Sequence, residues 1–261
     1  MSDTNSQQDQ NNDSANDVEL PLVQHLRELR DRLLKSLLVV VGIFASLVYF
    51  ADNIYSFIAA PIKDALPEGA NLVVIGLPST ISVQLKVTFW ASVMIAMPII
   101  IFQIWRFIAP ALYQKEKRIV IPLFASTVVL FYSGLAFSRY VIFPLAFPFL
   151  VGFAPADAQV MPDIKEYLNL VLQLFFAFGL AFEVPVATFL LIWSGVTDSE
   201  SLAKIRPYVF IGCFVIGMFL TPPDIFSQTL LALPMWLLFE LGILFGRMVR
   251  PIEKEQQADA G

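Results

Sequence analysis

The chain has 261 residues, of which 57% are hydrophobic and only 15% charged, and its mean hydropathy is +0.70. Soluble domains carry about 25% charged residues, so this composition excludes a soluble protein and indicates an integral membrane protein. The formal net charge of −5 says little about partners, because five acidic residues and no basic residue fall within positions 1–20.

Residues 1–20 are polar and free of aromatic side chains, so we expect a disordered tail there. The segment lacks the basic and apolar regions of a cleaved signal peptide, and we therefore expect it to be retained. Residues 21–248 are predicted to form one membrane domain, and residues 249–261 a second tail.

Six apolar runs approach the roughly 20 residues that a membrane-spanning helix needs. Runs such as "LLVVVGIF" and "LFFAFGLAF" do not alternate between apolar and polar residues, which excludes spanning β-strands. The sequence therefore predicts an all-α polytopic membrane protein with six transmembrane helices, over residues 33–50, 87–107, 119–136, 167–193, 208–220 and 225–245.

The fifth predicted span is unusually short. Between Pro207 and Pro222 there is room for about fourteen helical residues, or roughly 21 Å at 1.5 Å per residue, against a hydrocarbon core of roughly 30 Å. We expect such a span to thin the bilayer beside it or to recruit a neighbouring helix.

The placement of basic residues predicts the orientation. With six spans both termini share a side, and that side receives 13 of the 17 lysine and arginine residues; the exceptions are Lys63, Lys86, Arg139 and Lys165. The positive-inside rule then places both termini in the cytoplasm. Arg139 would lie at the outer interface if the third helix continued through "SRYVIFPLAF".

The first motif, "VQHLRELRDRLLKSLL", precedes the first span and carries leucines at helical spacing. It predicts an amphipathic helix lying at the membrane surface. On the pattern alone, Glu28 and Arg30 belong to a solvated, positively charged anchor.

The second motif, "QIWRFIAPALYQKEKR", follows the second span. Trp105, Phe107 and Tyr113 surround a short loop in which Glu116 stands among basic residues. The pattern alone favours an aromatic belt at the interface beside a basic loop.

The third motif, "FEVPVA", places Glu183 in the middle of the fourth span. A carboxylate at that depth costs roughly 2.5 kcal/mol or more unless it is protonated, paired or facing a wet or protein-lined surface. Pro185 also leaves the carbonyl of Ala181 without a helical donor. We expect Glu183 to face a concave, water-reachable surface formed with the fifth and sixth spans; a protonated carboxyl in a local hydrogen bond is the alternative.

The fourth motif, "FLTPPDIFSQTLLALP", joins the fifth span to the sixth. Pro222, Pro223 and Asp224 are expected to form a structural hinge there, and Pro61 another in the first outer loop. None of the four motifs contains a catalytic constellation or a metal-ligand set, so we expect no enzyme and no cofactor.

Taken in order, "HLRELRDRL", "FIAPALYQKEKR", "FGLAFEVPVA" and "RPYVFIGCFVIGMFLTPPDIFSQTLLALPMWLLFE" resemble the TatC family, the membrane receptor subunit of the bacterial twin-arginine protein translocase. The resemblance implies a concave bundle in the cytoplasmic (inner) membrane that binds twin-arginine signal peptides of folded precursors. It also implies assembly with TatB-like and TatA-like single-span proteins, with lipid and with further copies of itself, transport driven by the proton-motive force, and no nucleic acid.

The resemblance assigns signal-peptide binding to Glu28 and Glu116, with Phe107 as an apolar wall beside them. We expect Arg30 and Lys117 to keep these carboxylates ionised and in place. Contacts with a partner helix are expected at Glu183, Met218, Thr221 and Gln228, because lipid cannot satisfy polar atoms. The rival hypothesis is a proton-coupled secondary transporter with Glu183 as the proton carrier; an intramembrane protease lacks its catalytic residues.

Overall fold

The computed structural model describes residues 5–65, 72–74, 76–112, 117–153, 161–220 and 224–248. Most of these residues are helical. The helices in order are α1 (Asn5–Leu47), the 3₁₀ turn η1 (Val48–Phe50), α2 (Ala51–Ala65), α3 (Leu77–Leu112), α4 (Lys117–Phe137), the π-helical turn η2 (Ser138–Ile142), α5 (Phe143–Gly152), α6 (Ile164–Ala181), α7 (Val184–Trp193), α8 (Ser199–Lys204), α9 (Arg206–Leu220) and α10 (Ile225–Arg247).

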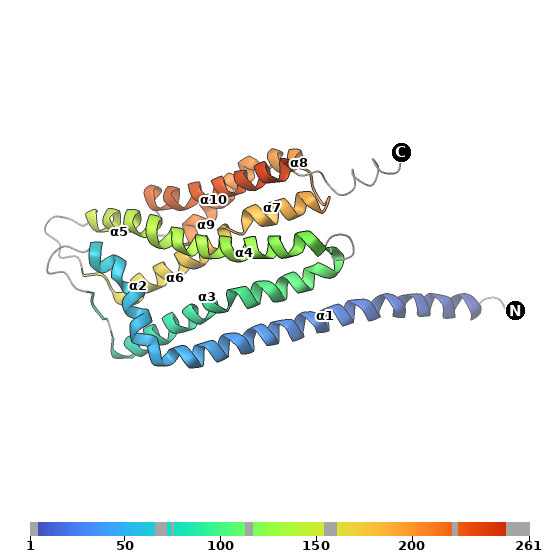
Figure 1. The fold of residues 1–261 in the computed structure, drawn as a ribbon, viewed down its shortest axis with the longest axis horizontal. Coiled ribbons are helices and arrows are strands. Elements are labelled where there is room, and N and C mark those ends of the chain that lie inside the picture. Colours follow the sequence, from blue (N-terminus) through green and yellow to red (C-terminus); the bar gives the residue numbers. More distant parts are fainter. Residues whose placement is uncertain are drawn as a thin grey trace.

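The long helices run side by side, and α1 begins at the same end of the bundle at which α10 ends (Figure 1). We call this the terminal end, and the other the opposite end. The end of α3, the start of α4 and α8 lie at the terminal end, and α2 and α5 lie at the opposite end (Figure 1). The described part of the chain therefore begins and ends on one side of the bundle, as six spans require.

Among the described residues, five helical segments are long and apolar enough to cross a membrane. The helix predicted to be short is α9, with 15 residues; it is roughly 22 Å long at 1.5 Å per residue. With the five long segments, α9 completes the six predicted apolar helices, and it is the short fifth one, since its length falls below a core of roughly 30 Å.

The first span differs from the prediction. The helix α1 runs unbroken into the bundle, so the expectation of a separate amphipathic helix on the membrane surface was wrong. No proline lies between Leu26 and Leu47, and the leucine stripe simply continues into the span. The assigned helix also includes residues 5–20; the disorder expected for that tail stays a prediction.

The third span continues beyond its predicted end. After α4, the turn η2 and the helix α5 extend it to Gly152. Arg139 lies in η2, with its guanidinium carbon 5.7 Å from the ring centre of Phe57 and 5.8 Å from that of Tyr140. Both distances are within the range of a cation–π contact, and the position of Arg139 at the outer membrane interface stays a prediction.

The core is built around α6. Its buried residues include Leu168, Leu172 and Phe178, which pack with side chains from α2, α3, η2, α5 and α10. At the crossing of α4 and α6, a Cβ added to Gly134 would lie 2.4 Å from the carbonyl oxygen of Phe178. Small residues let membrane helices approach this closely, and the approach fixes how α4 and α6 cross.

Candidate functional site

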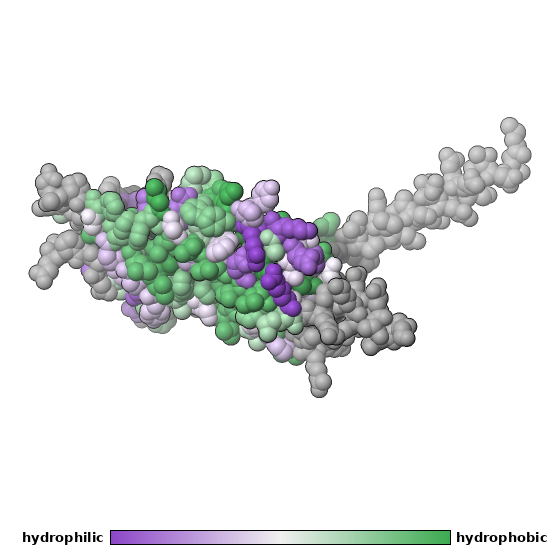
Figure 2. Space-filling view, turned by 90° about the horizontal axis from the view of Figure 1, so that it is seen from above, coloured by the Kyte–Doolittle hydropathy of each residue, from purple (hydrophilic) through white to green (hydrophobic). Residues whose placement is uncertain are grey.

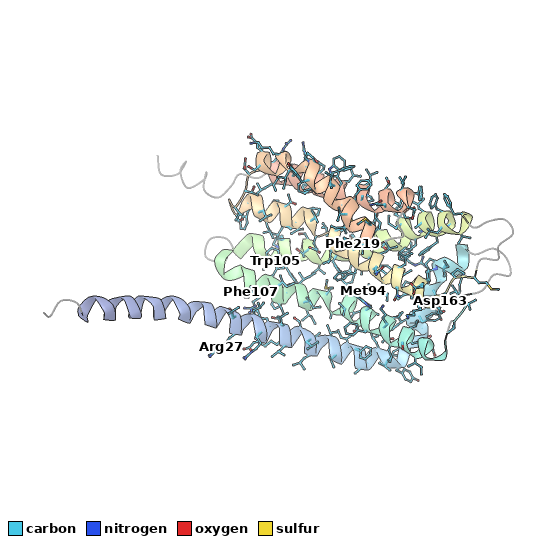
Figure 3. The ribbon with its side chains drawn as sticks, turned by 180° about the vertical axis from the view of Figure 1, so that it is seen from behind. Arg27, Met94, Trp105, Phe107, Asp163 and Phe219 are labelled. Carbon is cyan, nitrogen blue, oxygen red and sulfur yellow. The ribbon has the colours of Figure 1, made fainter. Side chains whose placement is uncertain are left out.

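A cavity of about 370 Å³ lies at the terminal end between α1 and α3. On α1 the lining residues recur at three- and four-residue spacing, which places them on one face of the helix; Figure 3 shows Arg27 on this part of α1, with Phe107 on the neighbouring α3. The residues that line the cavity are Arg27, Glu28, Asp31, Arg32, Lys35, Gln103 and Arg106.

The carboxylate of Glu28 is held within this cavity by Arg32, whose Nη2 donates to Glu28 Oε1 one turn away. Arg32 Nη1 also donates to the backbone oxygen of Gln103 at 3.4 Å, which ties the pair loosely to α3. The Arg32 side chain is only 11% exposed, whereas that of Glu28 is 43% exposed. Glu28 is therefore both positioned by the protein and accessible to a ligand.

Arg30 pairs with Asp31 and does not hold the carboxylate of Glu28, although we expected it to do so. Its Nη2 lies 2.7 Å from Asp31 Oδ1, and both side chains are more than half exposed. Residues two apart on a helix face different directions, whereas residues four apart are neighbours. The arginine that positions Glu28 is Arg32, and the spacing in the sequence could have identified it.

The aromatic residues of the second motif divide between two environments. Phe107 is half-buried on α3, one turn beyond Gln103, beside the cavity. Trp105 is buried in a cluster with Phe131 of α4 and Val186 of α7, so the expectation of an interfacial Trp105 was wrong. Glu116 and Tyr113 lie outside the described residues, as does the side chain of Lys117.

Glu183 stands where the fourth span is interrupted, between the end of α6 and the start of α7. Its backbone N–H donates to the oxygen of Leu180 at 3.0 Å. The side chain is half-buried, and its Oε1 is buried without a hydrogen-bond partner among the described residues. This polar group can be satisfied by water or by a partner, but not by lipid; whether it faces a surface shared with α9 and α10 stays a prediction.

The predicted contacts for a partner helix lie around α9. Met218 is exposed on α9. The amide nitrogen of Gln228 donates to the backbone oxygen of Phe214 at 2.9 Å, so this donor is used within the chain. Thr221 lies outside the described residues.

The predicted hinge residues do not share one kind of local structure. Pro61 is buried inside α2, where we expected a loop. Asp224 caps α10, because its Oδ1 accepts from the backbone N–H of Ser227 at 2.7 Å. Pro222 and Pro223 lie outside the described residues.

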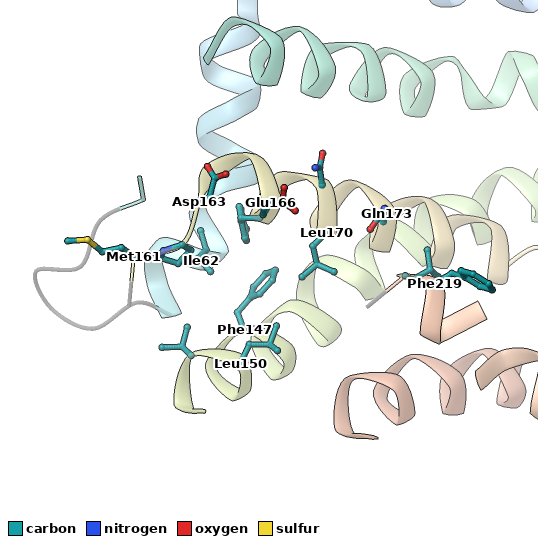
Figure 4. A pocket seen from close by; sticks show the side chains of 14 residues that line it. Ile62, Phe147, Leu150, Met161, Asp163, Glu166, Leu170, Gln173 and Phe219 are labelled. Atoms are coloured by element: carbon teal, nitrogen blue, oxygen red, sulfur yellow. The ribbon is translucent and has the colours of Figure 1, made fainter. Parts of the chain in front are cut away.

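A second cavity, of about 630 Å³, opens at the opposite end. Figure 4 shows Asp163 at the N-cap of α6, Glu166 on its first turn and Gln173 farther along that helix, toward Phe219 of α9. Sequence reasoning did not single out Asp163 and Glu166. Their spacing to Gln173 is helical and could have shown a polar face entering the bundle.

The described residues contain no group of three or more histidine, cysteine, aspartate and glutamate side chains that could hold a metal ion. The fold and the two cavities define a multi-pass helical membrane protein with a charged cavity at one end of the bundle. Its relatives identify the class more closely.

Residues 24–234 match the model of the TatC family, the Sec-independent protein translocase proteins. The chain is 55% identical over 243 residues to the Sec-independent protein translocase protein TatC of Azotobacter chroococcum mcd 1, with 93% of this chain and 95% of that one covered. It is 52% identical over 227 residues to the protein of the same name from Escherichia coli (strain K12), with 87% and 88% covered.

A solved structure described as the twin-arginine translocase receptor TatC has a TM-score of 0.78 and 37% identity, and covers 86% of this chain and 98% of that one. The chain belongs to the TatC family, and the resemblance drawn from its four motifs is confirmed. The family consists of protein translocase components and not of enzymes, and a proton-coupled transporter is not favoured.

Proposed function

We propose that this protein is the receptor subunit of a twin-arginine protein translocase and binds the twin-arginine signal peptides of folded precursors at the α1–α3 cavity. The observation that carries the proposal is the partly exposed carboxylate of Glu28, held by Arg32 in that cavity. Two TatC structures described as twin-arginine translocase receptors support it.

The recognition chemistry follows from the guanidinium group. Arginine binds a carboxylate through charge-assisted, often bidentate hydrogen bonds, which the point charge of lysine cannot reproduce. A carboxylate offers about four lone-pair sites, so Glu28 can accept from Arg32 and from an incoming arginine together. We propose Glu116, in the connection between α3 and α4 at the same end, as the carboxylate for the second arginine, with Phe107 as the apolar wall.

The basic residues of the cavity then act on specificity. Arg27, Arg32, Lys35 and Arg106 outnumber the acidic Glu28 and Asp31 among its lining residues. A positively charged segment that cannot form the bidentate contacts meets net repulsion there. Only a peptide that forms bidentate hydrogen bonds to the carboxylates overcomes this repulsion.

The location follows from the same assignment. We place the protein in the bacterial cytoplasmic membrane with the terminal end in the cytoplasm, because that end receives most of the lysine and arginine residues. The α1–α3 cavity then faces the compartment in which precursors fold.

Site-specific crosslinking tests the receptor function. A photoreactive group at Gln103 of the purified protein should crosslink to a peptide with two arginines. It should crosslink far less to the same peptide with two lysines. A matched probe at Lys165, at the opposite end, controls for general adhesion. Equal crosslinking of both peptides at Gln103 would contradict the proposal.

We propose that TatB-like and TatA-like single-span partners pack along α9. Tyr208, Ile211, Val215 and Phe219 are exposed at helical spacing along this short helix, so a second helix can cover the stripe. Met218 and Gln228 lie at its far end, and Thr221 follows it in the chain. Further copies of the protein complete the proposed assembly.

Disulfide scanning tests this surface, after the native Cys213 has been replaced by alanine. A cysteine at Met218 should crosslink to a cysteine in a TatB-like helix, and a cysteine at the equally exposed Leu37 of α1 should not. Crosslinks at Leu37 but not at Met218 would place the partner elsewhere.

A further inference from the structure

A third cavity, of about 380 Å³, lies between α9 and α10 at the terminal end. The face of the molecule in Figure 2 is hydrophobic along much of its length and has a hydrophilic patch toward the end where α8 and the end of α10 lie. The residues that line the cavity are Arg206, Leu237, Glu240, Leu241, Ile243, Leu244 and Arg247.

One wall of this cavity is apolar and faces outward. Leu237, Leu241 and Leu244 recur at spacings of four and three residues along α10 and are all exposed. Residues at this spacing form one stripe on a helix, and on a membrane span such a stripe contacts acyl chains. The cavity is therefore open to lipid along the leucine stripe.

Arg206 and Glu240 form an ion pair at the charged end of the cavity. Arg206 Nη2 donates to Glu240 Oε2 at 2.7 Å, and Arg206 Nε lies 2.7 Å from Glu240 Oε1 at an angle that makes no second hydrogen bond. A guanidinium has five N–H donors, so this pair leaves donors of Arg206 unused. The Arg206 side chain is partly exposed although its Nε is buried, so the donors open to a ligand are those of the two Nη atoms.

Arg247 supplies the second positive charge. It is the last residue of α10, is exposed, and has no acidic partner in the described part of the chain. It follows Glu240 by seven residues, or roughly 10 Å along the helix, which places it nearer the headgroups. The three charged side chains of the cavity leave one net positive charge beside an apolar wall.

We propose that this cavity binds an anionic phospholipid of the leaflet at the terminal end. The phosphate lies between Arg206 and Arg247, and an acyl chain lies along Leu237, Leu241 and Leu244. Basic pockets between membrane helices recognise phosphate headgroups in this way. The leucine stripe selects an intact lipid over a soluble phosphate, because only the lipid covers the apolar wall.

Binding of phosphatidylglycerol to the purified full-length protein, measured by native mass spectrometry, tests the site. Arg247→Gln should weaken binding by about tenfold or more, the effect of losing hydrogen bonds to a charged group. Lys204→Gln is the matched control, because Lys204 is exposed at the same end and does not line the cavity. General attraction to the surface charge amounts to about fivefold per basic residue and would affect both variants alike.

Leu244→Gln changes no charge and tests the apolar wall separately. It should weaken binding of phosphatidylglycerol and leave any binding of glycerol 3-phosphate unchanged. Equal losses in the Arg247 and Lys204 variants would overturn the proposal. So would phosphatidylcholine binding as tightly as phosphatidylglycerol, or glycerol 3-phosphate competing as well as the lipid.

Discussion

Replacing Glu28 by glutamine tests the signal-binding cavity most directly. The change keeps the shape of the side chain and one acceptor oxygen but removes the charge. A hydrogen bond to a charged group contributes about 1.5 to 3 kcal/mol, and 1.4 kcal/mol corresponds to a factor of ten in affinity. Because the Glu28 side chain is 43% exposed, solvent screens the interaction, and we expect the lower end of that range. Affinity for a twin-arginine peptide should fall about tenfold.

Isothermal titration in lipid nanodiscs measures this loss. The wild-type affinity should also fall with added salt, since the Debye length shrinks from about 10 Å at 0.1 M to about 3 Å at 1 M, and the Glu28→Gln affinity should fall less. Glu28→Asp should bind more weakly than the wild type as well, because the shorter chain misplaces the contacts. Glu200→Gln, an exposed change on α8 at the same end, is the matched control.

The fold of the variant must be checked, because Glu28→Gln removes the charged partner of the largely buried Arg32. Arg32 keeps its contact with the backbone oxygen of Gln103, so we expect only a small decrease in melting temperature. If the variant is folded and binds the peptide within twofold of the wild type, Glu28 is not a binding residue and the cavity assignment is wrong.

Substitutions at Arg32, Gly134 and Glu183 test three other parts of the bundle. Arg32→Gln should raise the affinity for a twin-lysine peptide about fivefold, because it removes about 1 kcal/mol of repulsion. The protein should then discriminate less between twin-arginine and twin-lysine peptides. Arg30→Gln should change the affinity for the twin-lysine peptide less than twofold. Gly134→Ala should lower stability by about 1 to 3 kcal/mol in thermal unfolding, because its Cβ meets the α6 backbone; Gly42→Ala, with open space around it, should not. The Glu183→Gln variant should retain transport, and the Glu183→Ala variant should lose crosslinking to the partner. If Glu183→Gln abolished transport and left partner binding intact, Glu183 would be a proton carrier instead.

The spans were predictable because their signals are local. Hydropathy locates all six, and the fourteen residues between Pro207 and Pro222 predict a helix close to the 15 residues of α9, which includes Pro207 in its first turn. The sequence predicts the continuation of the third span through η2 and α5 only conditionally, because hydropathy counts the arginine in "SRYVIFPLAF" against a membrane span. The structure shows how it is accommodated: Arg139 lies in a π-helical turn near two aromatic rings.

The candidate site was predictable only in part. The family motif selects Glu28, but which basic residue holds it depends on the helical face, and there Arg32 takes the place expected for Arg30. Trp105 shows the converse problem. An aromatic residue next to a basic loop fits an interfacial belt on pattern alone, and only the packing of α3 against α4 and α7 reveals that it is buried.

The helix α3 takes part both in the α1–α3 cavity and in the buried cluster that reaches α7. One of its faces lines the signal cavity through Gln103, while Trp105, two residues on, points to the other side of the helix into the buried cluster. Val186 of α7 belongs to that cluster and lies three residues from Glu183, at the break between α6 and α7. Packed side chains therefore connect α3 beside the cavity to α7, close to the break at Glu183.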